Sequence, residues 1–380
     1  MENSKKVNEV WFWQNMLTPH IGELAIEYAK LGHSVTFVSN QILSKDRLKL
    51  GWQAPKLFNV RFKLVKNKKD TLKLAKNASI ETIHLVQGIR SNGIIKYAQQ
   101  IFRERHLNYW VLMETINNHG WRGIIKSILY YVIFFYWRKN IQGVLAIGAD
   151  MPKWVVNHGI NKKRVYPFAY FLKEKTNQLL KISSASNLVF RFIFVGQLIK
   201  RKRVDYLIRA LATFKELNFE LWVIGTGNEK IYLQALANEL LGDKVSWFDS
   251  KPMHLIPKLI EKADCLVLPS QHDGWGAVVS EALMVGTPVI CTDSCGSSAV
   301  VRASNYGHVV PVNNQNAFIE ALYKQFKSGL WNLSKRKKLA KWARCLGAKS
   351  GALYLAKILN YNKKNPNHII PPWKLNTKNR

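Results

Sequence analysis

Two acidic residues flank a glycine-containing loop in the second half of the chain. Asp273 lies in the polar loop that follows an apolar strand expected over Cys265–Leu268. Glu281 follows eight positions later, about one turn inside the helix expected over Ala277–Val285. Ligands of open α/β sheets bind at such strand-to-helix connections, where the helix N-terminus favours phosphate or carboxylate. The stretch therefore predicts a ligand site.

A basic run earlier in the same half predicts an anion site. Between Gly196 and the helix expected over 204–217 stand four consecutive cations, Lys200, Arg201, Lys202 and Arg203. Backbone amides, the helix dipole and these side chains would converge on a bound anion. A solvated charge run on a surface loop is the alternative interpretation.

Charge is distributed unevenly around the two acidic residues. No Lys or Arg occurs from Ala263 to Val301, where the overall composition predicts about 6. Buried βα units carry few charges in general, which is the simpler explanation of the depletion. That explanation does not account for the two acids beside the loop.

The pattern of apolar runs predicts an α/β fold with two doubly wound, Rossmann-like domains. Polar residues without periodicity over 173–186 predict a linker between them. We expect an N-terminal domain over 1–175, a C-terminal domain over 187–350, and a helix and basic tail over 351–380 that return toward the first domain.

Strands and helices alternate in both predicted domains. In the first, strands are expected over 9–13, 34–38, 57–65, 80–86, 109–114 and 144–147. In the second, they are expected over 188–195, 220–224, 245–248 and 265–268. The opening βαβ unit lacks the glycine fingerprint of dinucleotide-binding domains. A fragment of that fingerprint occurs later, at Gly225 and Gly227, without the third glycine.

Composition limits the class of partner. The formal net charge of +33 predicts an affinity for polyanions, whether nucleic acid, anionic lipid or phosphorylated substrate. Four cysteines without a CxxC pair suit reduced thiols in a cytosol, and we expect no signal peptide. We expect no metal site and no cofactor, since the chain has no Asp-x-Asp motif and no second ligand pair near Cys291 and Cys295.

An apolar segment over Ile124–Trp137 has two interpretations. As a helix it would measure about 21 Å, too short for a hydrocarbon core of about 30 Å. It is either buried in the first domain or sunk in a membrane surface. Basic excess over Lys45–Lys76, and fifteen Lys or Arg without an acid from Ala321 to the end, suit an anionic membrane.

Three stretches together resemble a GT-B nucleotide-sugar glycosyltransferase of the retaining family 4 type. They are FVGQLIKRKRVDYLIRAL, VIGTGNE and ADCLVLPSQHDGWGAVVSEALMVGTPVICTD, which begin at Phe194, Val223 and Ala263. The last matches the family's acid, seven residues and Glu, followed by Ala, Gly, Thr, Pro and Val in order. The resemblance implies two such domains facing across a cleft, with the N-terminal domain on the acceptor side and the C-terminal domain binding the nucleotide-sugar donor.

The resemblance also implies roles for individual residues. Asp273 would contact the transferred sugar, Glu281 the nucleotide ribose and Lys202 the donor diphosphate. The remaining donor-binding positions would be Gly196, Gln197, Arg201, Gly225, Gly227, Gly274, Trp275 and Gly276. In the N-terminal half, a loop histidine would lie near the sugar; His119 is the candidate, with His20 behind it.

Three positions depart from the family pattern. The first acid is usually Glu and is Asp273 here, one methylene shorter. An Arg often follows the glycine, where this chain has Gln197, which places more of the phosphate charge on Lys202 and Arg201. The position after that Lys is often Gly and is Arg203.

The function that the resemblance implies is hexose transfer from a UDP- or GDP-sugar, with retention, to a cell-surface polysaccharide or lipid-linked glycan precursor. We expect a cytoplasmic enzyme peripheral to the inner face of the cell membrane, with no nucleic-acid partner. A basic nucleic-acid-binding protein is one alternative, although the chain shows no signature of such modules. An inactive sugar-nucleotide-binding GT-B protein is the other.

Overall fold

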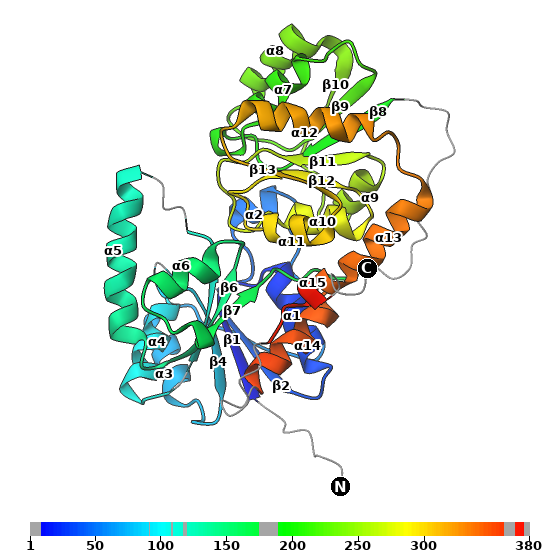
Figure 1. Ribbon diagram of the computed structural model, residues 1–380. Coiled ribbons are helices and arrows are strands. Elements are labelled where there is room, and N and C mark those ends of the chain that lie inside the picture. The colour runs from blue at the N-terminus through cyan, green and yellow to red at the C-terminus, as the bar shows by residue number, and fades with distance from the viewer. Residues whose placement is uncertain are drawn as a thin grey trace. The chain divides into compact units, whose positions relative to one another are not determined.

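The computed structural model describes residues 9–90, 92–107, 109–116, 120–174, 189–360 and 369–375; the side chain of Arg122 is also outside the description. The chain forms two compact units (Figure 1). Unit 1 comprises residues 1–45, 53–173 and 347–372, and unit 2 comprises residues 46–52, 174–346 and 373–380. Neither unit is a single stretch of chain.

Unit 1 contains a seven-stranded parallel sheet in the order β3-β2-β1-β4-β5-β6-β7. Its strands are β1 (Glu9–Met16), β2 (Ser34–Gln41), β3 (Arg61–Leu64), β4 (Ile83–Gln87), β5 (Tyr109–Glu114), β6 (Ile141–Ile147) and β7 (Val165–Phe168). Its helices are α1 (Pro19–Ala29), α3 (Lys68–Lys76), α4 (Ile95–Glu104), α5 (Gly120–Trp137), α6 (Met151–Asn157) and α14 (Ala348–Leu359). Figure 1 shows α1 and α14 on one side of this sheet and α3 and α4 on the other.

Unit 2 contains a six-stranded parallel sheet in the order β10-β9-β8-β11-β12-β13. Its strands are β8 (Phe190–Val195), β9 (Phe219–Ile224), β10 (Val245–Phe248), β11 (Cys265–Leu268), β12 (Val289–Thr292) and β13 (Gly307–Val310). Its helices are α2 (Lys45–Lys49), α7 (Val204–Ala212), α8 (Lys230–Leu241), α9 (Ile256–Glu261), α10 (Ala277–Met284), α11 (Ser298–Ser304), α12 (Gln315–Lys327), α13 (Leu333–Ala343) and α15 (Pro372–Leu375). The prediction of two doubly wound parallel sheets is confirmed.

The strand orders fix where ligands can enter each unit. In unit 1, the order reverses between β1 and β4, and in unit 2 it reverses between β8 and β11. At such a switch point, the connections after the two central strands leave the sheet in opposite directions, which opens a crevice at their carboxyl ends. Each described sheet therefore has one such switch point.

A short segment of the first half of the sequence belongs to unit 2, contrary to the predicted domain of residues 1–175. Gly51 O accepts a hydrogen bond from Met253 N at 3.1 Å. With φ of +78°, Gly51 approaches so closely that a Cβ would lie 2.6 Å from Lys251 O. This close backbone contact requires glycine, and it attaches α2 to unit 2.

The carboxyl-terminal helix α14 belongs to unit 1. Tyr354 donates its hydroxyl to Pro167 O at 2.9 Å and stacks on Phe168 with ring centroids 5.8 Å apart. Ala348 N donates to Leu172 O at 2.7 Å. The boundary of the units therefore falls before Gly347, rather than after residue 350.

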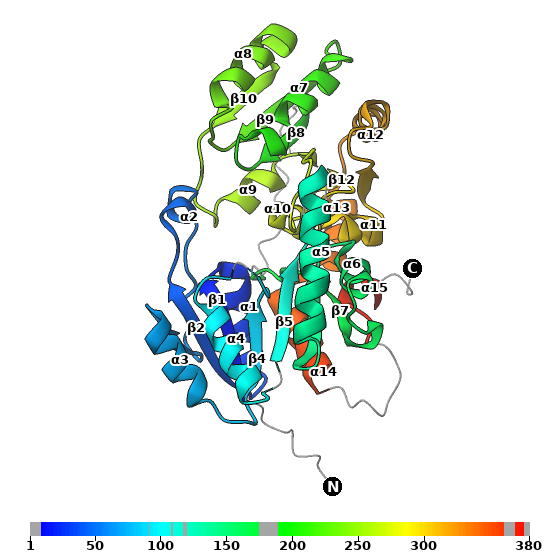
Figure 2. The ribbon, with the colours of Figure 1, turned by 90° about the vertical axis from the view of Figure 1, so that its left-hand side faces the viewer.

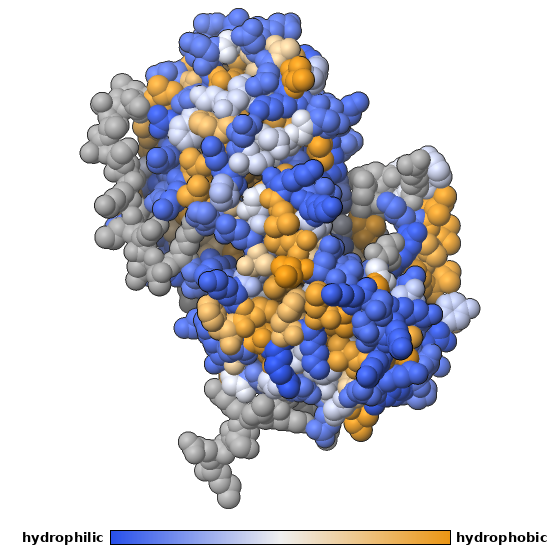
Figure 3. Space-filling view, turned by 180° about the vertical axis from the view of Figure 1, so that it is seen from behind, coloured by the Kyte–Doolittle hydropathy of each residue, from blue (hydrophilic) through white to orange (hydrophobic). Residues whose placement is uncertain are grey.

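Helix α5 is buried on one face only. Phe134 is fully buried, and Ser127 Oγ lies 2.6 Å from Nε2 of His158, the residue that follows α6. The opposite face is exposed and equally apolar. Its large exposed side chains are Trp121, Ile124, Ile125, Ile128, Tyr131, Val132, Phe135 and Tyr136. Figure 2 shows α5 running along the outside of unit 1, and Figure 3 shows its apolar side chains at the surface.

Aromatic side chains fill the core of unit 1 around a histidine. His84 is fully buried in β4, and Trp13 Nε1 donates to its Nδ1 at 3.2 Å. Its ring stacks on Phe102 with centroids 4.1 Å apart. Burial in this apolar environment, together with the charge of Arg105, lowers the pKa of His84 to about 3. The ring is therefore neutral in the folded protein at neutral pH.

Candidate active site

The candidate site lies at the switch point of unit 2, where the connections after β8 and β11 meet. Gly196 follows β8, and its N–H donates to Ile224 O at 3.0 Å. Leu198 N donates to Thr226 O at 2.9 Å, and Glu229 N donates to Leu198 O at 3.0 Å. These bonds hold the loops after β8 and β9 together.

Two glycines make this contact between the loops possible. A Cβ at Gly225, where φ is +150°, would lie 1.9 Å from Gly196 O. A Cβ at Gly227 would lie 2.1 Å from Leu198 O. Neither distance is compatible with a side chain, so both positions require glycine for packing, whatever else they contact.

The basic turn before α7 is bound to the loop after β11. Gln271 N donates to Arg201 O at 2.9 Å, and the Arg201 guanidinium donates to His272 O. Arg203 lies in the left-handed region with φ of 54° and donates to Asn313 Oδ1. These contacts give Arg201 and Arg203 a structural role at the site.

Lys202 and Asp273 form an ion pair between Nζ and Oδ2. Their side chains are only 11% and 14% exposed. The sequence predicts separate contacts for them, with diphosphate and with sugar, and the structure brings the two groups together. The site therefore has a partly buried cation that can bind a phosphate and, in contact with it, an anion that can accept a hydrogen bond from a hydroxyl.

The loop after Asp273 is shaped by glycines. At Gly276, where φ is +81°, an added Cβ would lie 2.9 Å from Leu268 Cδ2. An added Cβ at Gly296 would lie 2.0 Å from Gly274 O. Trp275 is 3% exposed, and its Nε1 donates to Ser280 Oγ at 3.2 Å. The indole therefore anchors the loop to α10.

The remaining predicted residues are placed as follows. Glu281 is half-buried on α10, eight residues beyond Asp273, and Gln197 follows Gly196 in the loop after β8. His119 lies outside the described residues. His20 is 6% exposed, near the N-terminus of α1 in unit 1. The ligand contacts assigned to all four stay predictions.

Two buried serines at the site were not predicted. Ser270, directly after β11, and Ser297, just before α11, are fully buried, and neither hydroxyl has a hydrogen-bond partner. Ser297 Oγ lies 3.3 Å from the position that a Cβ of Gly276 would occupy. A lone serine carries no recognisable sequence signal, so only the fold identifies them.

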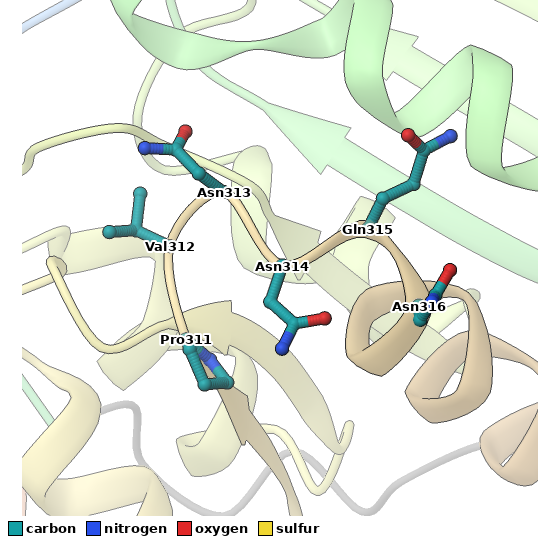
Figure 4. A pocket seen from close by; sticks show the side chains of 6 residues that line it. All are labelled: Pro311, Val312, Asn313, Asn314, Gln315 and Asn316. Carbon is teal, nitrogen blue, oxygen red and sulfur yellow. The ribbon is translucent and has the colours of Figure 1, made fainter.

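A pocket of about 450 Å³ lies near the site, at the end of β13 (Figure 4). Its lining carries amides and no charged side chain: Pro311, Val312, Asn313, Asn314, Gln315 and Asn316. Asn314 caps α12 by accepting from Ala317 N at 3.0 Å. Asn313 is the residue bound by Arg203, so the pocket borders the basic turn without containing the Lys202–Asp273 pair.

The described residues contain no group of three His, Cys, Asp or Glu side chains that could hold a metal ion. All four cysteines are buried as free thiols. Burial raises the pKa of Cys265 and Cys345. The pKa of Cys291 is also raised, chiefly by its hydrogen bond with Cys295 and then by burial. Cys265, Cys291 and Cys345 therefore stay protonated, and all four cysteines act as small apolar core residues.

Comparison with known proteins gives a family for the second half. Residues 180–345 match the family model described as Glycosyl transferases group 1. The lipopolysaccharide 1,6-galactosyltransferase of Escherichia coli K12 is 27% identical over 186 residues, 47% of this chain and 51% of that protein. This chain spans about half the length of these curated relatives or less. An uncharacterised glycosyltransferase of Methanocaldococcus jannaschii is 33% identical over 112 residues, which are 29% of this chain and 29% of that protein.

Solved structures extend the likeness to both units. The apo form of the lipopolysaccharide outer core galactosyltransferase WaaB has a TM-score of 0.69 at 15% identity, covering 92% of this chain and 99% of that one. Anabaena HepE in complex with UDP has a TM-score of 0.70 at 13% identity, covering 93% and 99%. At these identities the likeness shows the fold. This chain has the GT-B fold, and its residues 180–345 carry the Glycosyl transferases group 1 region.

Proposed function

We propose that this protein transfers a hexose from a nucleotide sugar to a glycan acceptor, with retention of the anomeric configuration. The observation that carries the proposal is the Lys202–Asp273 pair at the β8/β11 switch point, enclosed by loops whose glycines permit close backbone approach. Relatives named as lipopolysaccharide, colanic acid and teichuronic acid biosynthesis glycosyltransferases support a cell-surface glycan as the acceptor.

The chemistry requires two kinds of stabilisation. Cleavage of a sugar–phosphate bond develops positive charge on the sugar and negative charge on the departing diphosphate. Lys202 would neutralise the diphosphate without a metal ion, and Asp273 would accept hydrogen bonds from the sugar. Glu281 would bind the ribose hydroxyls. A donor diphosphate that enters the site would pair with Lys202 in place of Asp273. The Asp273 carboxylate would then be available to accept hydrogen bonds from the sugar.

The donor is a UDP- or GDP-sugar, and UDP is the better supported of the two. Solved structures of HepE, which has the same fold, contain UDP or UDP-glucose. A thermal-shift screen with UDP, UDP-glucose, GDP and GDP-mannose tests the choice, because a ligand that binds the folded state raises the melting temperature. UDP ligands should give the larger shift; a larger shift with GDP ligands would reverse the choice.

Turnover decides between an active enzyme and an inactive binding protein. Purified protein should release UDP from UDP-glucose, and nuclear magnetic resonance of the first sugar product should show the α-anomer if configuration is retained. Release of the β-anomer would refute retention. Tight UDP-glucose binding without release of UDP, with or without a glycan extract as acceptor, would favour the inactive alternative.

We further propose that the protein works on an anionic membrane surface, to which α5 binds. The eight exposed apolar side chains of α5 recur at helical spacing, while Phe134 on the opposite face is buried in the core. None of the described helices is long and apolar enough to cross a bilayer. A helix held by one face, with an apolar outer face, suits the interface between head groups and acyl chains.

Charge on the same unit favours an anionic lipid as the partner. Helix α3 carries four exposed lysines around a pocket: Lys68, Lys69, Lys73 and Lys76. Arg138 and Lys139 follow α5 directly and are also exposed. Each cation near an anionic surface contributes about 1 kcal/mol, which salt weakens. Two weak signals, apolar and electrostatic, together give stable binding.

Flotation with liposomes tests the membrane proposal. Ile128→Gln combined with Phe135→Gln should abolish binding to anionic vesicles, because it removes two side chains that are 62% and 56% exposed. Ile231→Gln is the matched control: its side chain is 83% exposed, but it lies on α8 of unit 2. Equal binding of the unsubstituted protein, the double variant and Ile231→Gln would refute the proposal. Binding to zwitterionic vesicles that does not decrease as the salt concentration rises would also refute it.

A further inference from the structure

Two residues with left-handed backbones are bonded to each other beside Lys202. Arg203, with φ of 54°, directly follows that lysine, and Asn313, with φ of 65°, lies on the loop between β13 and α12 (Figure 4). The two residues are 110 positions apart, and the Arg203 guanidinium donates to Asn313 Oδ1. Asparagine tolerates a left-handed backbone better than most residues, whereas for arginine it is strained. Strain of this kind persists only where other contacts hold the residue in place.

A second contact fixes the arginine side chain. The Arg203 guanidinium lies over the ring of Tyr206, 4.2 Å from its centroid. Tyr206 is only 9% exposed and stacks on Phe318 of α12 with ring centroids 5.0 Å apart. The arginine therefore ties the turn before α7 to the loop before α12 and, through Tyr206, to α12 itself.

The loop that carries Asn313 is also bonded on the Asp273 side of the site. Val312 N donates to Asp293 Oδ1 at 3.0 Å. The next residue along the chain, Ser294, accepts a hydrogen bond from Asp273 N at 3.2 Å through its carbonyl oxygen. The loop after β13 thus holds the basic turn at one residue and the loop of the aspartate at its neighbour.

We propose that the hydrogen bond between Arg203 and Asn313 is a positioning contact, which sets how the Lys202 ammonium group meets the donor diphosphate. This inference rests on the proposed function, in which Lys202 binds that diphosphate. Arg203 acts through the backbone that it shares with Lys202 and does not touch the ligand. A misplacement of about 1 Å can slow an enzyme by up to about 100-fold, so a contact that fixes this turn affects turnover.

Glycine substitutions on either side of the contact test the proposal, because glycine adopts a left-handed backbone without strain. Arg203→Gly and Asn313→Gly each remove the hydrogen bond while they favour the existing backbone. The melting temperature of each variant should therefore stay within about 2 °C of that of the unsubstituted protein. Each should lower kcat for release of UDP from UDP-glucose by about ten-fold and change KM by less than about two-fold.

The double variant, the conservative variant and a control make the test specific. Arg203→Gly combined with Asn313→Gly should be as slow as either single variant, because both residues act through one hydrogen bond. Asn313→Asp should keep kcat within about two-fold, since its carboxylate accepts the same hydrogen bond. Asn305→Gly is the matched control: Asn305 has φ of 58° but lies at the end of α11, so kcat should not change.

Three kinetic results would overturn the proposal. A loss of kcat in Arg203→Gly but not in Asn313→Gly would show that the arginine charge itself acts on the donor. Losses that multiply in the double variant would show that the two residues act separately. A melting temperature lower by more than about 5 °C at unchanged kcat would make the contact merely structural.

Phosphorus nuclear magnetic resonance of bound UDP separates this proposal from the proposed function. The β-phosphate resonance should shift in Arg203→Gly and Asn313→Gly in the direction that Lys202→Ala gives, and should not shift in Asn305→Gly. An unchanged resonance in both glycine variants would overturn the positioning contact, whether or not the protein turns over UDP-glucose. Shifted resonances in a protein that releases no UDP from UDP-glucose would count against the proposed function alone.

Discussion

At the scale of single residues, the ion pair of Lys202 and Asp273 makes different demands on the two groups during a reaction. In the proposed reaction, the lysine would face a diphosphate whose negative charge grows as the bond to the sugar breaks. The aspartate would face a sugar that is bound throughout. Substitution of each residue should therefore affect binding and turnover in different proportions.

Lys202→Ala should lower kcat by about 100-fold, the cost of removing one stabilising donor at a developing charge, and should raise the KM for the donor much less. Steady-state kinetics with UDP-glucose measure both constants. Lys200→Ala is the control, since Lys200 is exposed in the same turn. A rise in KM at unchanged kcat would make Lys202 a binding residue only.

Asp273→Asn should reduce transfer strongly while leaving UDP affinity nearly unchanged, because we place this carboxylate on the sugar and not on the nucleoside. Glu281→Gln should instead weaken UDP binding, by about 1.5 to 3 kcal/mol, which is the value of a hydrogen bond to a charged group. Calorimetry with UDP compares the two variants. The opposite order of affinities would mean that the two roles are exchanged.

At the scale of elements, the loops after β8 and β9 depend on glycine at their contact. Gly225→Ala should reduce the free energy of unfolding by at least about 2 kcal/mol, because a left-handed backbone and an overlap with Gly196 O combine. Gly242→Ala should cost only about 1 kcal/mol, since φ is +61° there but nothing lies within 4 Å of the added Cβ. Urea unfolding measures both; equal losses would show that the loop contact is dispensable.

Most strands could be predicted because they are buried runs of apolar residues, as the parallel sheets require. β5, β10 and β11 begin and end at the predicted residues. β7 was missed because it is short and contains Pro167, which is tolerated since β7 lies at the edge of the sheet. Helix α3 was missed because lysines dominate its sequence and only Thr71 and Ala75 are buried.

At the scale of the whole molecule, proximity in space was the hardest property to predict. Lys202 and Asp273 are 71 residues apart, and only the adjacency of β8 and β11 in the sheet brings them together. The resemblance to the family gave their roles but not their contact. The exchange of α2 and α14 between the units also has no sequence signal, because each helix depends on partners far along the chain.

The free energy of unfolding should depend on pH because His84 has different pKa values in the folded and unfolded chain. Its pKa is about 3 when folded and near 6.5 when unfolded, so between these values the unfolded chain binds the additional proton. The contribution of His84 to the free energy of unfolding is complete above pH 6.5 and decreases as the pH falls. At pH 4 the free energy of unfolding should be lower by roughly 3 kcal/mol. His84→Gln should remove this part of the pH dependence. Urea unfolding from pH 7 to pH 4 measures it, and parallel curves for the two proteins would contradict it.

The place of α14 in unit 1 determines the order in which the protein can fold during synthesis. Helix α1 begins at Pro19, whereas α14, which packs against it, ends at Leu359. A ribosome completes the first strands of unit 1 early, but the helix that covers α1 can leave the exit tunnel only after the chain has been made beyond Leu359. All of unit 2 except its last residues is translated in the meantime. The amino-terminal unit is therefore the last to become complete, and a chain cut after unit 2 would leave α1 uncovered.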